Sequence, residues 1–200
     1  MEIWVVRHGE TYFNRQRIVQ GKGVNSSLNA TGLAQAAGFY NTHKHAGFDQ
    51  IYISTLKRTY QSVAAFINDG IPYQQHAGLD EISWGIHEGQ KSDAASYNDF
   101  RDLLKKWEAG DISARITGGE SPEEVQLRQR DFLSLMEQSG REKILICSHG
   151  RSMRILLCTM LGQPLNNMGN FPHHNLGLYV LSGNAGEYSI SRFNDLSHLD

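Results

Sequence analysis

Two short apolar runs stand out in the hydrophobic pattern of the chain, and each stops at a histidine. Residues 3–6 read IWVV and lead into Arg7 and His8, and residues 143–148 read KILICS and lead into His149. A short apolar run that stops abruptly at polar residues is typical of a buried strand. Ligands of open α/β sheets bind at the carboxyl ends of the strands. We therefore expect both histidines to reach the same edge of the sheet, where a pocket would lie.

Strand and helix patterns alternate along the remaining chain. Residues 48–53 predict a further strand, and residues 71–76 predict a short strand at a sheet edge. Ser121, Pro122 and Glu124 together form a strong helix-start signal. Helices are predicted from Asn29 or Thr31 to about residue 44 and at 56–69, 92–109, 121–137 and 151–162. Two last strands are predicted at 176–181 and 187–193, separated by SGNAG. This alternation predicts an α/β fold.

Two polar segments match neither period, and we expect them to be loops beside the pocket. Residues 12–27 directly follow the first strand and carry Arg15, Arg17 and Lys22. Residues 79–90 contain acidic and aromatic side chains and two glycines. Irregular loops of this kind in a compact domain are often functional.

The helices predicted at 29–44 and 92–109 carry narrower expectations. The buried face of the first helix should consist of Leu33, Ala36, Ala37 and Tyr40. His43 and His45, at its end, have no Cys or carboxylate cluster nearby, so we expect exposed polar residues and not a metal site. The second helix has an apolar stripe of Tyr97, Phe100, Leu103, Leu104 and Trp107. We interpret the segment at about 90–120 as a lid-like insertion over the pocket mouth.

Composition narrows the range of functions. The chain has 200 residues, of which 40% are hydrophobic and 20% charged, and this suits one domain spanning 1–200. A net charge of -2 and a pI near 6.5 give no basic footprint for nucleic acid or an anionic membrane. Cys147 and Cys158 are expected to be buried and reduced. With no signal segment and no apolar run of membrane-spanning length, the expected location is the cytoplasm.

A second arginine lies at the same kind of position as Arg7. Arg58 falls in the first turn of the helix that follows the strand at 48–53. A cation is disfavoured at the positive end of a helix. That cost is a hint that Arg58 has a functional role. Glu120, just before the helix cap at Ser121, fits a structural role or a place in the site equally well.

Seven motifs in order along the chain indicate a family. They are RHGET at 7–11, the loop through Asn14, Gln20 and Gly21, NSSLNATGLAQA at 25–36, STLKRTYQS at 54–62, LDEISWGIHEG at 79–89, GGES at 118–121 and SHG at 148–150. With this ordered set the chain resembles the histidine phosphatase family, the phosphoglycerate mutase-like superfamily, most weakly between 90 and 117. The resemblance implies a three-layer α/β/α sandwich. Its sheet would be mostly parallel and roughly six-stranded, with one antiparallel strand.

The resemblance also implies roles for individual residues. His8 would be the nucleophile that takes the phosphoryl group, with Arg7, Arg58 and His149 around the phosphate. Glu81 would be the proton donor, and Glu88 is its competitor for that role. Further contacts with the phosphorylated substrate would come from Asn14, Gln20, Gly21 and Gly150. No cofactor and no metal would be required.

The chemistry of phosphoryl transfer agrees with these assignments. Cationic groups around the non-bridging oxygens supply most of the stabilisation. Guanidinium groups suit this task because they bind phosphate through two N–H groups at once. The same positive surroundings should lower the pKa of His8 and keep one ring nitrogen free to attack.

We favour a phosphomonoester hydrolase acting through a phosphohistidine on a small phosphorylated metabolite. The alternatives are a cofactor-dependent phosphoglycerate mutase, a non-catalytic phosphate-binding module and a metal hydrolase with His8, Glu81 and His149 as ligands. Two fixed arginines beside a divalent cation argue against the metal. The expected partner is a small phosphorylated substrate, and we expect binding neither to nucleic acid nor to a membrane. A homodimer stays an open alternative.

Three residues depart from the usual pattern of the family that the chain resembles. Asn25 stands where an Asp is frequent, His87 where a Trp is frequent, and Arg151 adds a positive charge beside the second His-Gly pair. These residues, with the basic residues of 12–27, are expected to shape the substrate wall. They do not identify the leaving group.

Overall fold

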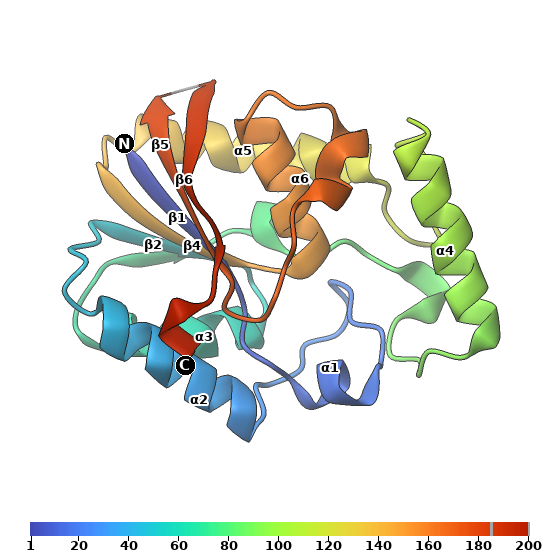
Figure 1. Cartoon of the computed structure of the whole chain (residues 1–200), viewed down its shortest axis with the longest axis horizontal. Coiled ribbons are helices and arrows are strands. Elements are labelled where there is room, and N and C mark those ends of the chain that lie inside the picture. The colour runs from blue at the N-terminus through green and yellow to red at the C-terminus, as the bar shows by residue number, and fades with distance from the viewer. Residues whose placement is uncertain (185, 200) are drawn as a thin grey trace.

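The computed structural model describes residues 1–184 and 186–199, and a six-stranded sheet forms its centre (Figure 1). The strands are β1 (Glu2–Arg7), β2 (Gln50–Ile53), β3 (Tyr73–Gln75), β4 (Lys143–Ser148), β5 (Leu178–Asn184) and β6 (Glu187–Asp195), in the order β3-β2-β4-β1-β5-β6. Strands β3, β2, β4 and β1 pair in parallel, whereas β5 is antiparallel to both of its neighbours. The predicted mostly parallel sheet with one antiparallel strand is confirmed.

Helices cover both faces of this sheet, with α2 and α3 on one side and α5 and α6 on the other (Figure 1). The helices are α1 (Tyr12–Gln16), α2 (Ala30–His43), α3 (Lys57–Asn68), α4 (Ala94–Glu108), α5 (Pro122–Gln138) and α6 (Gly150–Met160). Short 3-10 turns are η1 (Ala77–Leu79), η2 (Gly85–His87), η3 (Leu165–Asn170) and η4 (Ser197–Leu199).

The central strand β1 shows why the core has two halves. Ile3 and Val5 belong to the hydrophobic cluster under α5 and α6, whereas Trp4 and Val6 belong to the cluster under α2 and α3. Successive side chains of a strand point to opposite faces. A strand covered on both faces is therefore apolar at every position, as the run at 3–6 is.

The register between β1 and β4 brings the two apolar runs to one edge. Arg7 is the partner of Ser148 in the parallel ladder, and the His8 N–H donates to the Ser148 carbonyl at 3.0 Å. His8 and His149 are the next residues along the two strands. The prediction that both histidines reach one edge is confirmed.

The start of α5 follows the predicted capping pattern. The Ser121 hydroxyl accepts from the Glu124 N–H at 3.3 Å, and the Glu124 carboxylate accepts from the Ser121 N–H at 2.8 Å. Pro122 occupies the first helical position, where its missing N–H has no intrahelical partner to lose. A cap of this kind stabilises a helix by about 1 kcal/mol.

The segment at 12–27 is not the continuous loop that we predicted. The short helix α1 begins after Thr11, whose side chain accepts from the Asn14 N–H at 3.1 Å while the Asn14 side chain accepts from the Thr11 N–H. It ends at Arg17, which has a left-handed backbone with φ 56. Five residues are too few to show a helical period in the sequence, so only the cap could have indicated it.

The buried face of α2 also differs from the prediction. Leu33 is 51% exposed, and the helix instead buries Gly32, Phe39 and His43. His43 was expected to be exposed, yet its ring packs edge to face against Trp4 and Phe39, with centroids 4.9 and 5.0 Å apart. A histidine counts as polar in a hydropathy pattern, but its ring packs like an aromatic side chain.

The helix expected at 92–109 is α4, and it begins at a capping Asp93. Leu103 and Trp107 are buried as predicted, but Tyr97 is 66% exposed. Figure 1 shows α4 at one end of the molecule, apart from the layers that cover the sheet. Within the described ranges, no helix is long and apolar enough to cross a membrane.

The two last strands form as predicted, but the turn between them is shorter than expected. Strand β5 continues to Asn184, so most of the segment SGNAG at 182–186 extends the sheet. Ala185, in the predicted turn, lies outside the described residues. The predicted stop of α6 is found at Gly162, which has a φ of 63.

Candidate active site

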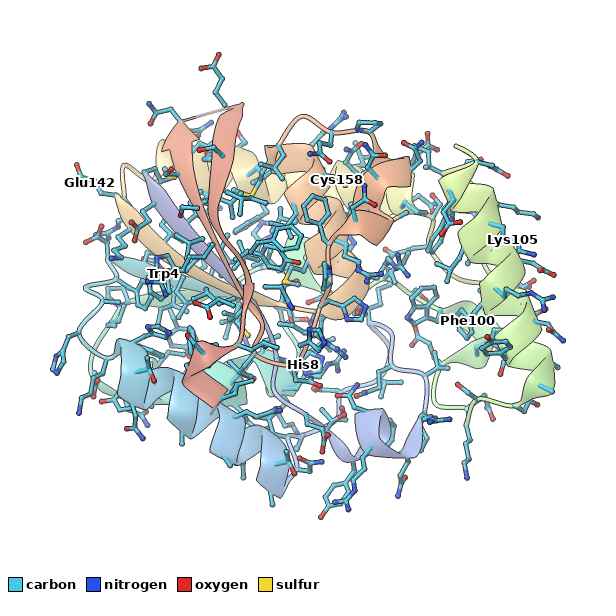
Figure 2. All side chains as sticks on the ribbon, viewed as in Figure 1. Trp4, His8, Phe100, Lys105, Glu142 and Cys158 are labelled. Carbon is cyan, nitrogen blue, oxygen red and sulfur yellow. The ribbon has the colours of Figure 1, made fainter. Side chains whose placement is uncertain are left out.

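A pocket of about 230 Å³ opens at the carboxyl ends of β1 and β4. Figure 2 shows His8 near the centre of the molecule and Phe100 on α4 to one side of it, and both side chains line this pocket. The complete lining is Arg7, His8, Asn14, Ile18, Val19, Gln20, Glu81, Trp84, Phe100, Gly150, Arg151 and His173. It includes most of the side chains that the sequence proposed for the site.

His8 is 3% exposed and presents one ring nitrogen for reaction. Its Nδ1 atom lies 2.7 Å from the Gly9 carbonyl oxygen. Because a carbonyl only accepts, Nδ1 carries the proton and Nε2 keeps its lone pair. Burial, followed by the charges of Arg58 and Arg7, lowers the pKa of His8 well below its usual range. The ring is therefore neutral and nucleophilic at neutral pH.

Arg7 has an unused hydrogen-bond donor beside His8. Its Nη1 atom donates to the His173 carbonyl at 2.8 Å and lies 3.2 Å from the ring atom Nδ1 of the same residue. Its Nε atom is buried and has no hydrogen-bond partner among the described residues. A buried guanidinium N–H without a partner is costly, so it indicates an oxygen ligand such as a phosphate.

Arg58 and His149 form a pair directly behind His8. Arg58 Nε donates to His149 Nδ1 at 3.1 Å, so the proton of His149 sits on Nε2, which donates to the Ser54 hydroxyl at 2.7 Å. The two histidine rings lie 5.2 Å apart between centroids. Both Arg58 and His149 are fully buried and neither belongs to the pocket lining. His149, fixed by Arg58, therefore packs against the ring of His8 from outside the pocket.

The two candidate acids occupy different environments. Glu81 is 7% exposed and lines the pocket, and its carboxylate accepts from the N–H groups of Ile82, Arg151 and Ser152 at 3.0, 3.2 and 2.9 Å. Two of these N–H groups belong to the first turn of α6, where a negative charge is favoured. Glu88 lies outside the pocket lining. Its place makes Glu81 the stronger candidate for the proton donor.

Glu88 joins the two loops beside the pocket. Its carboxylate accepts from the Trp84 N–H and from the Gly23 N–H, both at 2.9 Å. A Cβ atom on Gly21 would lie 1.9 Å from a Glu88 oxygen and 2.9 Å from the Ile82 carbonyl. Only glycine fits at this position, and this explains why Gly21 belongs to the motif although it does not line the pocket.

Asn14 and Gln20 present their amide groups to the pocket from the loop side. The Asn14 oxygen accepts from the Thr11 N–H at 3.1 Å, and the Gln20 oxygen accepts from the hydroxyls of Thr11 and Ser26. Since both side-chain oxygens are engaged, the amide N–H groups are left for an anionic ligand.

Gly150 allows a close approach at the start of α6. A Cβ atom there would lie 3.2 Å from His173 Nδ1 and 3.5 Å from Arg7 Nε. The absence of a side chain lets Arg7 reach the first turn of the helix. The Gly150 N–H and the Arg7 guanidinium thus share one side of the pocket, while the next two N–H groups of α6 hold Glu81.

Two of the unusual residues have structural partners. The Asn25 side chain accepts from the Lys57 N–H at 2.8 Å and so caps α3. His87 pairs with Asp99 of α4 at 2.9 Å, and its ring lies 5.3 Å from that of Phe100. His87 therefore links the loop at 79–90 to the predicted lid.

The other charged residues around the mouth are mostly engaged or remote. Glu120 pairs with Lys22 at 2.7 Å and with Arg128 at 3.3 Å, and it accepts from the Ser83 N–H. Its role in the structure is to hold the loop beside the pocket. Arg15 and Arg17 do not line the pocket.

His173 is a pocket residue that the sequence did not reveal. It lies in an irregular segment that the backbone places beside β1 through a hydrogen bond from the Leu176 N–H to the Arg7 carbonyl at 3.0 Å. Burial, then Arg7 and Arg154, lowers the pKa of His173 to about 3. No periodic pattern marks this segment, so its place in the site depends on the tertiary fold.

The side chains that could bind a metal ion are scattered, and the two cysteines are buried. Residues 1–184 and 186–199 contain no group of three or more His, Cys, Asp and Glu side chains arranged to hold a metal ion. Cys147 and Cys158 are buried and unpaired, as predicted. Burial raises the pKa of the Cys158 thiol to about 12, so it is not a reactive thiolate.

Known proteins are similar in sequence to this chain over nearly its whole length. A putative phosphoserine phosphatase 2 of Hydrogenobacter thermophilus is 27% identical over 198 residues, which cover 98% of this chain and 96% of that protein. A probable phosphoglycerate mutase GpmB of Yersinia pestis is 30% identical over 208 residues, which cover 100% of this chain and 95% of the relative.

Solved structures share the fold. The YhfR protein of Bacillus stearothermophilus superposes with a TM-score of 0.84 at 25% identity, covering 100% of this chain and 99% of the other. The alpha-ribazole phosphatase of Shigella flexneri superposes with a TM-score of 0.83 at 24% identity, covering 98% and 96%. The family model of the histidine phosphatase superfamily (branch 1) matches residues 3–196. This chain therefore belongs to branch 1 of the histidine phosphatase superfamily.

Proposed function

We propose that this protein hydrolyses phosphomonoesters of small metabolites through a phosphohistidine at His8. The observation that carries the proposal is the placement of His8, whose Nδ1 is engaged by the Gly9 carbonyl and whose ring lines a pocket beside the unpartnered Nε of Arg7. The lowered pKa keeps Nε2 of His8 unprotonated. A neutral imidazole beside a cationic pocket is suited to attack on a phosphoryl group.

In the first step, His8 Nε2 bonds to the phosphorus atom and the bond to the leaving oxygen breaks. Arg7 Nε and the Gly150 N–H at the start of α6 stabilise the charge on the non-bridging oxygens, while the next two N–H groups of the helix hold Glu81. Arg58 and His149 fix the ring of His8 from behind through the contacts described above. A small movement that opens the His149–Ser54 hydrogen bond would add a further donor to the phosphate.

Glu81 is the residue proposed to handle protons. In its protonated form it gives a proton to the departing alkoxide, and the resulting carboxylate takes a proton from the water that attacks the phosphohistidine. Inorganic phosphate leaves, and both His8 and Glu81 return to their starting states. Such acid–base assistance accelerates a reaction by about a hundredfold to ten-thousandfold.

The relatives support a phosphatase and also keep a mutase as a second candidate. One relative is named a putative phosphoserine phosphatase, and another a probable phosphoglycerate mutase. A mutase must return the phosphoryl group to the bound product before water reaches it. Product analysis separates the two activities, because a phosphatase releases inorganic phosphate and a mutase interconverts phosphoglycerates.

The first test is the substitution His8→Ala. We expect this variant to lose hydrolysis of p-nitrophenyl phosphate, since no other residue can take over the covalent step. Wild-type protein mixed rapidly with a phosphorus-labelled substrate should carry an acid-labile label, and the variant should not. Arg130→Gln, an exposed change on α5, serves as the control with normal turnover. Unchanged turnover in His8→Ala would exclude this mechanism.

The same assay distinguishes a metal hydrolase. We expect full activity in excess chelator, because the proposed steps use only protein groups. Loss of activity with the chelator, restored by added metal, would favour the metal alternative. A screen of phosphomonoesters would then identify the substrate.

A further inference from the structure

A second cavity adjoins the active-site pocket on the side of α4. It measures about 170 Å³ and lies between α4, α6 and η3, with Trp107, Arg154 and Met168 among its lining residues. Arg151 lines both this cavity and the pocket that contains His8. Its side chain therefore stands where the two spaces meet, on the side to which a leaving group could extend.

The side chain of Arg151 is held in place by an aromatic ring and is not engaged in an ion pair. Its guanidinium carbon lies 5.1 Å from the ring centroid of Trp107. Its backbone N–H donates to a Glu81 oxygen at 3.2 Å. Within the part of the chain that the structure describes, its guanidinium forms no ion pair. A guanidinium stacked on an aromatic face keeps its N–H edges free for a planar anion.

The arginines around the pocket are not neutralised by direct contact with acids. No ion pair among residues 1–184 and 186–199 includes Arg7, Arg58, Arg151 or Arg154, whereas surface arginines such as Arg128 are paired. The acids near these arginines have other contacts or lie across the second cavity. Glu81 and Glu88 are held by backbone N–H groups, Asp80 is held by Thr55, and Glu108 lines the second cavity.

A phosphoryl group brings at most two negative charges. Arg7 lines the pocket beside His8, Arg58 acts on His8 from outside the lining, and their two charges already match that of the phosphoryl group. Arg154 donates to the Phe171 carbonyl at 2.6 Å, which fixes its side chain beside the second cavity. Among the described residues, the half-buried guanidinium of Arg151 is thus left without a carboxylate in ion-pair contact, an arrangement that is costly unless a ligand supplies an anion.

We propose that Arg151 binds a second anionic group in the leaving group of the substrate, directed toward the cavity beside Trp107. The substrates would then be phosphomonoesters that carry a carboxylate or a second phosphate. This inference rests on the proposed phosphatase function. Arg151 acts as a specificity residue, because it contacts the leaving group and not the phosphoryl group in transfer.

The test compares substrates that differ in one charge. Phosphoglycolate and hydroxyethyl phosphate have the same chain length but end in a carboxylate and a hydroxyl. Ethylene glycol bisphosphate is the third substrate and ends in a second phosphate. We expect the wild-type protein to prefer a charged substrate in kcat/KM, and Arg151→Gln to lower that preference by about tenfold to a hundredfold. Arg151→Lys should retain part of it, and Arg130→Gln all of it.

The preference of charged over neutral substrate is the decisive ratio. An equal ratio in wild-type protein and Arg151→Gln would overturn the role of Arg151 and leave the phosphatase function standing. Binding of the same three compounds to His8→Ala, measured by calorimetry, separates the two proposals. If no variant hydrolyses any phosphomonoester, the proposed function fails, and the binding preference still decides whether Arg151 holds an anion. Circular dichroism checks that each variant is folded.

Discussion

At the scale of single residues, the site depends on side chains whose hydrogen bonds leave one atom free. His8 uses Nδ1 to hold its ring, and Asn14 and Gln20 use their oxygens to hold the loop. In each case a protein contact fixes the orientation and leaves a different atom for the ligand. This preorganisation means that little rearrangement is needed when a phosphate arrives.

Glu81 gives the sharpest prediction at this scale. Glu81→Gln keeps a side-chain oxygen for the N–H groups of α6 but cannot give and take a proton. We expect kcat to fall by about a hundredfold to ten-thousandfold with an alkyl phosphate, whose leaving oxygen needs a proton. With p-nitrophenyl phosphate the formation of the phosphohistidine should be much less affected, as a pre-steady-state burst would reveal.

Glu88→Gln is the comparison for this prediction. Glu88 holds the Gly23 and Trp84 N–H groups, so its substitution should loosen the loop without changing how rate depends on the leaving group. If Glu88→Gln, and not Glu81→Gln, lost kcat selectively with the alkyl phosphate, Glu88 would be the proton donor in place of Glu81.

At the scale of elements, α4 is connected to the site by aromatic contacts. The ring of Phe100 lies 5.1 Å from that of Trp84, and both line the pocket. His87 and Asp99 add a polar link between the loop and the same helix. These contacts support the prediction that the segment at about 90–120 covers the pocket mouth.

A substitution on α4 tests this covering role. Phe100→Ala should raise KM severalfold and weaken the exclusion of water, because it removes an aromatic wall from the pocket. Tyr97→Ala is the matched control, since Tyr97 lies on the same helix, is 66% exposed and does not line the pocket. Steady-state kinetics of both variants measure the effect. Equal KM values in the two variants would show that α4 does not contribute to binding.

At the scale of the whole molecule, an aromatic cluster joins α2, β1 and the C-terminal turn. His43 packs against Trp4, Phe39 and His198, at centroid distances of 4.9, 5.0 and 5.5 Å. His43 Nε2 and His198 Nδ1 are buried without hydrogen-bond partners among the described residues. Protonation of this cluster would place an unpaired charge among aromatic rings.

The cluster predicts a loss of stability in acid. Burial, then His198 and Arg192, lowers the pKa of His43 from 6.5 to about 4, although Asp195 acts in the opposite direction. The unfolded chain therefore binds a proton at higher pH than the folded one does. Stability should be complete above about pH 7 and should decrease as the pH falls toward 4, by a total of roughly 3 kcal/mol.

Urea unfolding at several pH values measures this dependence. His43→Phe keeps an aromatic ring and removes the titrating group, so its stability should fall less steeply between pH 7 and 4. His45→Gln changes an exposed histidine nearby and should follow the wild-type curve. Identical slopes for His43→Phe and the wild-type protein would assign the acid sensitivity to other groups.

Much of the fold could be predicted because it depends on local rules. The apolar runs at 3–6 and 143–148 had to be strands buried on both faces, and the Ser121–Glu124 pattern had to begin a helix. The face of α2 could not be predicted in the same way. Its burial is decided by Trp4 and the C-terminal turn, which approach it only in the folded chain, and not by the period of its own side chains.

The sequence by itself determined that Arg7, His8 and His149 meet at one edge of the sheet. Each of these residues stands where an apolar run ends, and a buried strand ends with its apolar run. The sequence also determined the motif set that identifies the family. Only the tertiary structure decided that Glu81 faces the pocket while Glu88 ties two loops, that His173 joins the site, and that Arg151 lies between two cavities. These depend on distances between segments far apart in the chain, and periodicity, which describes one segment at a time, carries no information about them.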